Sequence, residues 1–247
     1  IYSTDGAFAA LKKDGSVTVW GDEFSGGVRG KDGINVATNV KEVRATSGAF
    51  AFIHDDDTVS TLGYWNNGGG ADGQAAAALA SGQVHDVFSS EFTFAALLKN
   101  GKVVTWGVGP SGGDSSGVAN DLVGVREIVG NRNSFAAIKK GGGVVSWGIS
   151  GDNYVDIADQ LSSGVVKVVA SDQAFAAIKS DGSVQTWGSP QFGADSSAVV
   201  DQISRGVVDI TASDGAFAAR KVDGSVVTWG DLGGESQAVS QQLASGV

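Results

Sequence analysis

The chain offers few side chains that could carry catalysis. Its 247 residues include two histidines, no cysteine and no methionine. Both histidines, His54 and His85, fall within one stretch of the sequence. The rest of the chain therefore has no histidine for a Ser-His-Asp catalytic triad. Neither the Gly-Lys-Ser/Thr of a phosphate-binding loop nor the His-Glu-x-x-His of a zinc site occurs. We therefore expect no catalytic residues and no enzyme; a pair of carboxylates acting as in a glycosidase stays open.

Two kinds of acidic segment could bind a metal ion or another ligand. His54-Asp55-Asp56-Asp57 carries oxygen ligands of the kind that hold Ca²⁺, but such cages usually gather residues over a longer loop. We favour a solvated hairpin tip there and predict no metal site. Asp114-Ser115-Ser116 and Asp195-Ser196-Ser197 precede short helical patterns, which favours helix capping over ligand binding. No cofactor is expected.

Irregular aromatic residues are the better candidates for binding. Tyr64 and Trp65 follow Leu62, which stands where other copies of a repeated motif have tryptophan. They could anchor a binding surface, since Trp and Tyr dominate interface hot spots. Alternatively, Trp65 fills the volume that Leu62 leaves empty. With the aromatics of the same loop in other copies, the candidate partner-binding residues are Tyr64, Trp65, His54, Tyr154, Phe192 and Phe24.

These candidates lie in a sequence that repeats six times with a period of about 40 residues. We predict one domain, 1–247, with repeats 1–39, 40–83, 84–124, 125–164, 165–206 and 207–247. The predicted core consists of the aromatic residues that the repeats share: Phe8, Phe50, Phe94, Phe135, Phe175, Phe217, Trp20, Trp106, Trp147, Trp187 and Trp229.

Each repeat predicts three strands and a short helix. In the last repeat, a β-branched run at 206–210 predicts the first strand, and Ala-Phe-Ala-Ala at 216–219 lies in the second. We interpret the alanines as places where a neighbouring sheet comes close. Asp223-Gly224 predicts a type I′ hairpin turn into a third strand at 225–230, and Asp14-Gly15 predicts the same turn in the first repeat. A Gly-rich loop follows, in which a fourth strand is left open, and then a short amphipathic helix.

Small sheets with two apolar faces cannot stand alone. Arranged radially, each buries both faces against its neighbours. We therefore predict an all-β fold, a single β-propeller of about six blades with three to four antiparallel strands each. A short helix would join the blades, and the two termini would close the ring; seven blades is the alternative.

Bulk properties limit the partners. The net charge of −10 argues against a nucleic-acid partner, and no apolar run is long enough for a membrane helix. The chain begins at Ile1 without methionine, which suggests a processed form or part of a larger polypeptide. An extracellular or cell-surface location is favoured.

The repeat Gly-Val-Val-x-Ile-x-Ala-Ser-x-x-x-Phe-Ala-Ala-x-Lys-x-Asp-Gly-Ser-Val-x-Thr-Trp-Gly resembles that of the regulator of chromosome condensation family. It resembles the short bacterial-type version, found in the propeller-shaped β-lactamase inhibitory protein, more than the longer eukaryotic repeat. The resemblance covers essentially the whole chain. It implies a propeller, usually of seven blades, and relatives that bind proteins through aromatic loops at one end of the ring. Guanine-nucleotide exchange is the activity of the founding member.

We expect a non-enzymatic interaction module that presents propeller loops to a protein or glycan partner. The first alternative is a structural spacer within a long repeat protein. The second is a guanine-nucleotide exchange factor.

Overall fold

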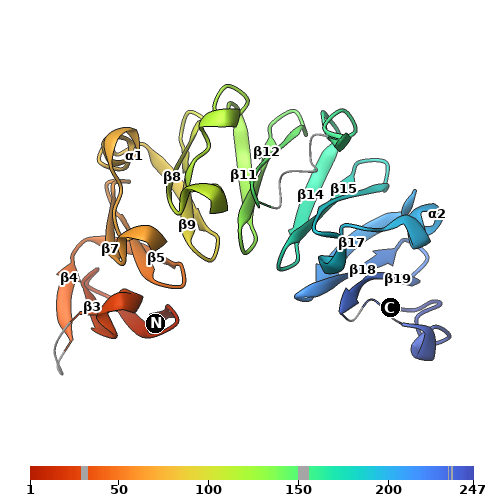
Figure 1. The fold of residues 1–247 in the computed structure, drawn as a ribbon, viewed down its shortest axis with the longest axis horizontal. Helices are drawn as coiled ribbons and strands as arrows, with labels where there is room; N and C mark the ends of the chain where they lie inside the picture. Colours follow the sequence, from red (N-terminus) through yellow and green to blue (C-terminus); the bar gives the residue numbers. More distant parts are fainter. Residues whose placement is uncertain (29–32, 150–155, 233, 235) are drawn as a thin grey trace. The chain divides into compact units, whose positions relative to one another are not determined.

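The computed structural model describes residues 1–28, 33–149, 156–232, 234 and 236–247. They form two compact units, Ile1–Ile128 (unit 1) and Val129–Val247 (unit 2). Within each unit the sheets follow one another in chain order (Figure 1).

Six antiparallel sheets make up the described chain. The first has four strands, β1 (Tyr2–Ser3), β2 (Ala7–Leu11), β3 (Val17–Gly21) and β4 (Ile34–Ala37). The others in unit 1 are β5 (Val40–Ala45), β6 (Ala49–His54) and β7 (Val59–Gly63), then β8 (Val84–Ser89), β9 (Thr93–Leu98) and β10 (Val103–Gly107). β11 (Val125–Gly130) spans the boundary of the units and belongs to the sheet with β12 (Ser134–Lys139) and β13 (Val144–Gly148). Unit 2 continues with β14 (Val165–Ala170), β15 (Ala174–Lys179), β16 (Val184–Gly188), and with β17 (Val207–Ala212), β18 (Gly215–Lys221), β19 (Val226–Leu232). The prediction of an all-β fold with six sheets of three to four strands is confirmed.

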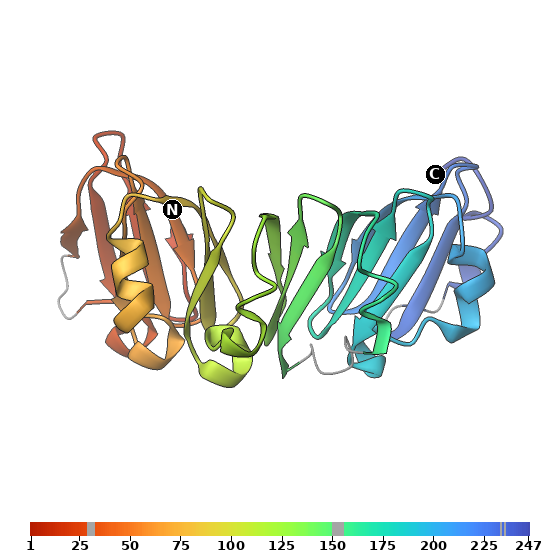
Figure 2. The same cartoon turned by 90° about the horizontal axis from the view of Figure 1, so that it is seen from above.

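Short helices lie in the connections (Figure 2). They are η1 (Glu23–Ser25), η2 (Trp65–Asn67), α1 (Gly73–Leu79), η3 (Gly109–Gly113), η4 (Ser116–Val118), η6 (Pro190–Phe192), η7 (Ser197–Val199), α2 (Val200–Ile203) and η8 (Gln237–Val239). Among the described residues a fourth strand occurs in the first sheet alone, where β4 pairs with β3.

The middle strand of a sheet is buried on both faces. In β9, all residues from Thr93 to Leu97 are buried, and the small Ala95 and Ala96 leave room for the neighbouring sheets. Phe94 lies opposite Trp106, and their rings stack with centroids 5.2 Å apart. Burying a side chain of this size contributes about 1.5–3 kcal/mol. The same Phe–Trp pair recurs in the first, fourth, fifth and sixth sheets.

Phe8 differs from the other shared phenylalanines. It is 46% exposed, whereas the other five are at most 1% exposed. In unit 1, Phe50 and Phe94 are each covered by the preceding sheet, and no sheet of that unit precedes the first. Closure of the ring, the single-domain organisation and the repeat boundaries stay predictions.

The hairpin prediction was right in place and wrong in type. Gly15 has φ of 77°, but Asp14 is not among the residues with positive φ, so the turn is not type I′. Instead, Gly15 N–H donates to the carbonyl of Lys12 at 3.0 Å, which makes a type I turn followed by a left-handed residue. The Asp14 carboxylate accepts the N–H of Ser16 at 3.0 Å, and this bond favours the type I geometry.

Candidate functional site

One end of each sheet carries both the turn between its first two strands and the loop after its third strand. We call this the loop end; the Asp-Gly hairpins lie at the opposite, hairpin end. In unit 1 the loop end consists of turns 4–6, 46–48 and 90–92 and loops 22–27, 64–69 and 108–113. Backbone hydrogen bonds join successive turns, from Asp5 N to Ser47 O at 3.0 Å and from Ser47 N to Glu91 O at 2.8 Å.

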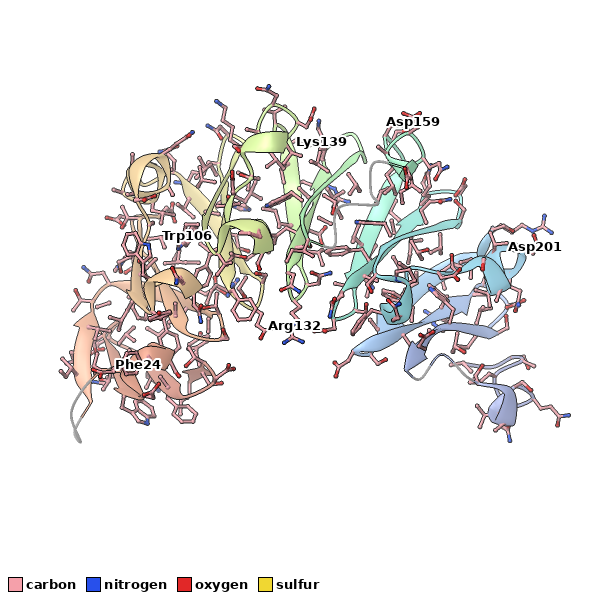
Figure 3. All side chains as sticks on the ribbon, in the orientation of Figure 1. Phe24, Trp106, Arg132, Lys139, Asp159 and Asp201 are labelled. Carbon is pink, nitrogen blue, oxygen red and sulfur yellow. The ribbon has the colours of Figure 1, made fainter. Side chains whose placement is uncertain are left out.

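The loops are fixed from two sides. Within its own sheet, the hydroxyl of Thr46 donates to the carbonyl of Asn67 at 2.7 Å. From the next sheet, the indole of Trp106 donates to the carbonyl of Gly68 at 3.1 Å (Figure 3 labels Trp106). Gly68 has φ of 90° and lies so close to Phe94 that a Cβ would come within 2.5 Å of the ring. The backbone of a loop held in this way is fixed, and its remaining side chains project from that fixed backbone.

Three of the predicted partner-binding residues are exposed at this loop end. Phe24 of η1 is 67% exposed (Figure 3), and Tyr64 and Trp65 are 45% and 59% exposed. η1 lies against β7, the strand that leads into Tyr64 and Trp65. Gly26, which follows η1, contacts Gly48 at the turn of the same sheet. The aromatic residues therefore come from adjacent loops of neighbouring sheets.

Leu62 is smaller than the tryptophan of the other sheets, and a residue other than Trp65 fills the remaining space. Phe52 stands where the other repeats have alanine, and its ring stacks on Phe50 with centroids 6.2 Å apart. Phe52 is 2% exposed, while Trp65 extends into solvent. Phe52 rather than Trp65 thus takes the place of the stacked tryptophan.

The other predicted partner-binding residues lie elsewhere. Phe192 belongs to unit 2, where it packs against a buried cluster that includes Phe217. Its carbonyl accepts the hydroxyl of Ser171 at 2.7 Å. Tyr154 lies outside the described residues.

His54 lies at the hairpin end, away from Tyr64 and Trp65. Its Nδ1 is 2.9 Å from the carbonyl of Thr38, and its Nε2 is 2.8 Å from the hydroxyl of Ser60. The structure does not bring this residue together with the aromatic loops.

The acidic tip next to His54 is tied into the hairpin. Asp56 accepts the N–H of Thr58 at 3.0 Å, and Asp57 takes the left-handed position with φ of 61°. Hydrogen bonds from Lys41 and Lys99 lower the pKa of Asp57 to about 2. No group of three or more His, Asp or Glu side chains suited to a metal ion is found in the described part of the chain.

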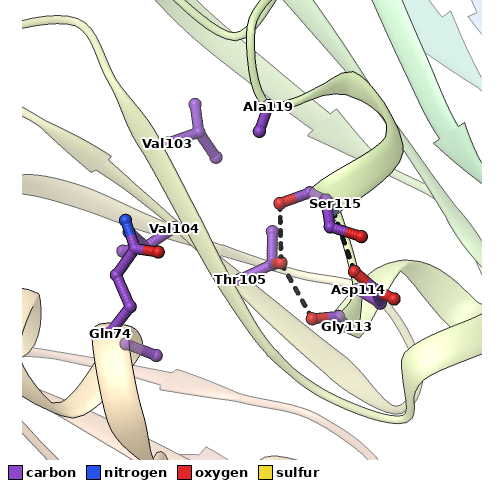
Figure 4. A pocket seen from close by; sticks show the side chains of 10 residues that line it. Gln74, Val103, Val104, Thr105, Gly113, Asp114, Ser115 and Ala119 are labelled. Atoms are coloured by element: carbon purple, nitrogen blue, oxygen red, sulfur yellow. Dashed lines mark hydrogen bonds between the residues drawn. The ribbon is translucent and has the colours of Figure 1, made fainter.

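A groove of about 280 Å³ lies between α1 and β10 (Figure 4). Thr105 at its floor donates to the hydroxyl of Ser115 at 3.0 Å and to the carbonyl of Gly113 at 2.9 Å. Asp114 accepts the N–H of Ser116 at 2.9 Å, and this bond lowers the pKa of its carboxyl. Because Asp114 is the one acidic residue among those that line it, the groove does not hold the carboxylate pair of a glycosidase.

Two segments beside this groove, 109–113 and 113–117, fit the Gly-x-Ser-x-Gly spacing of a nucleophile elbow. An elbow exposes its serine next to a histidine, but Ser111 is 5% exposed, and the hydroxyl of Ser115 accepts a hydrogen bond from Thr105. Among the described contacts, neither serine is hydrogen-bonded to a histidine. The spacing therefore does not mark a nucleophile here.

Small antiparallel sheets that stack a Phe–Trp pair against the loop of the preceding sheet are the blades of a β-propeller fold. Over 92% of its length the chain is similar to Prp20p from Saccharomyces cerevisiae, with 15% identity, a TM-score of 0.54 and 70% of that chain covered. Human WBSCR16 matches with 17% identity, a TM-score of 0.54 and 75% of its chain covered. For the ectodomain of the receptor kinase CR4 from Physcomitrella patens the identity is 17% and the TM-score 0.51, and the chain spans 60% of its length.

These similarities show the fold. No protein-family model and no curated protein sequence matches the chain. Among the described residues, no helix has the length and apolar character that a membrane crossing requires.

Proposed function

We propose that the protein is a non-enzymatic interaction module that binds a protein partner through the loop end of unit 1. Tyr64 and Trp65 would be the anchors, with Phe24 beside them. The observation that carries the proposal is the exposure of three large aromatic side chains on adjacent loops whose backbones are fixed. We further propose that the repeat is of the short bacterial type.

Physical chemistry supports this assignment. Tyrosine and tryptophan supply large contact areas for few rotatable bonds, so they lose little conformational entropy when a partner covers them. A loop that is already ordered adds no further ordering cost on binding. An exposed aromatic side chain that no partner covers contributes nothing to the stability of the fold.

The similar structures support a protein partner. The crystal structure of Prp20p is described together with its binding properties to Gsp1p and histones. The same yeast protein has also been solved in complex with Kap60. Fold similarity at 15% identity does not transfer these partners to the chain.

The test compares the wild type with the double variant Tyr64→Ala/Trp65→Ala in capture from the native source, read out by quantitative mass spectrometry. We expect the captured partner to fall at least about tenfold, since each hot-spot residue contributes about 2 kcal/mol or more. The melting temperature should barely change, because both side chains are exposed. Val222→Ala, at a 76% exposed residue of the unit 2 hairpin end, is the control and should keep full capture. A structural spacer would instead lose nothing in the double variant.

Guanine-nucleotide exchange is the second candidate, favoured by the fold shared with Prp20p. It requires that the protein accelerate nucleotide release from a small GTPase. Release at the intrinsic rate, measured with a fluorescent nucleotide, would remove it.

A further inference from the structure

We propose that the outer edge of β10 binds an extended, uncharged peptide segment of a partner protein, which pairs with β10 as a fourth strand. The site is the groove between α1 and β10. It is separate from the loop end of unit 1, so the inference goes beyond the proposed function. The unpaired backbone of β10 and the fourth strand of the first sheet support it.

The first sheet shows that this edge of a third strand accepts another strand. β4 pairs antiparallel with β3 through the positions of Val17 and Val19. Counted back from the shared Trp-Gly, Val103 and Thr105 of β10 occupy the same two positions. In the described part of the chain, no strand pairs with β10 on this side. The third sheet therefore leaves open the place that β4 fills in the first.

The backbone of β10 is unpaired where that of β3 is paired. Leu98 N–H donates to the carbonyl of Lys102 at 2.8 Å. Because the backbone groups of successive residues in an antiparallel strand point to alternate sides, those of Val104 face β9, and those of Val103 and Thr105 face away from it. Among the described contacts, neither Val103 nor Thr105 has a backbone hydrogen bond on this outer side. Each therefore offers one N–H and one carbonyl to an added strand.

The side chain of Val103 is also less covered than its counterparts. The corresponding valines of four other sheets are at most 8% exposed, whereas Val103 is half-buried. The four are Val17, Val59, Val144 and Val184. The sixth sheet has a larger groove of about 610 Å³ beside β19, but there the N–H of Val226 already donates to the carbonyl of Leu243 at 2.8 Å. Among the described third strands, β10 alone combines an open backbone with a half-buried valine at this position.

The walls of the groove define what can enter it. In the view of Figure 4, Gln74 of α1 lies on one side of β10, and Ser115 and Ala119 lie on the other. A groove of about 280 Å³ between two such walls admits one extended chain but not the edge of a second folded sheet. Asp114 is the one charged residue among those that line it, which favours an uncharged occupant. In such strand addition the main-chain hydrogen bonds give the affinity.

The experiment measures binding of the acetylated peptide Thr-Val-Thr-Val-Thr, labelled at its carboxyl terminus, by fluorescence anisotropy. Two further peptides carry N-methyl groups, one on both valine amides and the other on the second and third threonine amides. Since only alternate amides of a strand face its neighbour, we expect one methylated peptide to bind at least about tenfold more weakly than the parent and the other within about threefold of it. Equal affinities of the two methylated peptides, or no saturable binding of the parent, would overturn strand addition.

Two exposed positions give a matched pair of protein variants. Ala119→Trp places a large side chain on the wall of the groove, and Asn120→Trp places it on the next residue, outside the groove. We expect Kd to rise at least about tenfold in Ala119→Trp and less than about twofold in Asn120→Trp, because only the first blocks the groove. Val103→Pro, which removes an outward N–H from an edge strand, should also weaken binding. Equal Kd values in the two tryptophan variants would show that the groove is not the site.

Two further outcomes separate the occupant and the site from the alternatives. Tyr64→Ala/Trp65→Ala should leave Kd for the peptide within about twofold of the wild type, because sites without shared contacts behave independently. Loss of peptide binding in that variant would overturn a separate site, whereas loss of native capture alone leaves it standing. Self-association of the protein that Ala119→Trp abolishes would identify a second copy as the occupant and overturn the peptide partner.

Discussion

At the scale of single residues, the second sheet fills its core with a different aromatic pair from the one that the other sheets use. Elsewhere a phenylalanine stacks on a tryptophan of the third strand, with alanine two residues after the phenylalanine. Here Leu62 replaces the tryptophan, and Phe52 replaces the alanine and stacks on Phe50. The aromatic volume has moved from the third strand to the second.

This exchange predicts strong coupling between the two positions. Phe52→Ala should cost about 3–5 kcal/mol by leaving a cavity, and Leu62→Trp about 1–3 kcal/mol by overpacking. The double variant restores the Phe–Trp arrangement of the other sheets and should recover to within about 1 kcal/mol of the wild type. Urea denaturation of the four proteins measures this cycle. Additive costs would show that the two side chains do not share one space.

At the scale of elements, the Gly-rich loop is what joins a sheet to the next. Gly68 contacts Phe94, and its carbonyl accepts the indole of Trp106. In unit 2, Gly193 contacts Phe217 and accepts the indole of Trp229 at 2.9 Å. In unit 1, loop 64–69 therefore packs between two sheets and also positions Tyr64 and Trp65.

Gly68→Ala should damage this element. A Cβ would lie 2.5 Å from the Phe94 ring, and φ of 90° strains any other residue, so we expect a loss of about 1–3 kcal/mol. Gly117→Ala is the matched control, because a Cβ there meets nothing within 4 Å; we expect a change within about 1 kcal/mol. Thermal unfolding compares the two. Equal melting temperatures would contradict the role given to the loop.

At the scale of the whole molecule, a recurring carboxylate hydrogen bond makes folding depend on pH. Eight aspartates have a pKa lowered below the ordinary 3.8, chiefly by hydrogen bonds: Asp14, Asp56, Asp57, Asp114, Asp181, Asp195, Asp209 and Asp223. In six of them the partner is the residue two positions on, and in Asp57 and Asp209 it is lysine. A lowered folded pKa means that the unfolded chain takes up protons first as the pH falls.

We therefore expect the melting temperature to be steady above about pH 5 and to fall progressively as the pH drops from 4 toward 2. Circular dichroism at pH 7, 4 and 2.5 measures this. In Asp57→Asn, which lacks the carboxylate with the pKa of about 2, the melting temperature at pH 7 should be lower and the acid loss smaller. A melting temperature that rises as the pH falls below 4 would contradict the assignment.

The sequence by itself determined the strands and the partners within each sheet. Phe94 faces Trp106 because a short hairpin between two strands fixes their register, and this is local information. It also located the hairpin at Asp14-Gly15 but not its type, which depends on the hydrogen bond that the N–H of Ser16 donates to the Asp14 carboxylate.

Only the tertiary structure decided what the aromatic residues do. Trp65 and Phe192 lie in the same loop of their repeats, yet the first is exposed and the second packs against a buried cluster of unit 2, while Phe52 is buried beside Phe50. It also separated His54 from Tyr64 by placing them at opposite ends of one sheet. The physical reason is that strand pairing follows from the nearest residues in the chain. Exposure follows from which distant turns are brought to the same end of a unit.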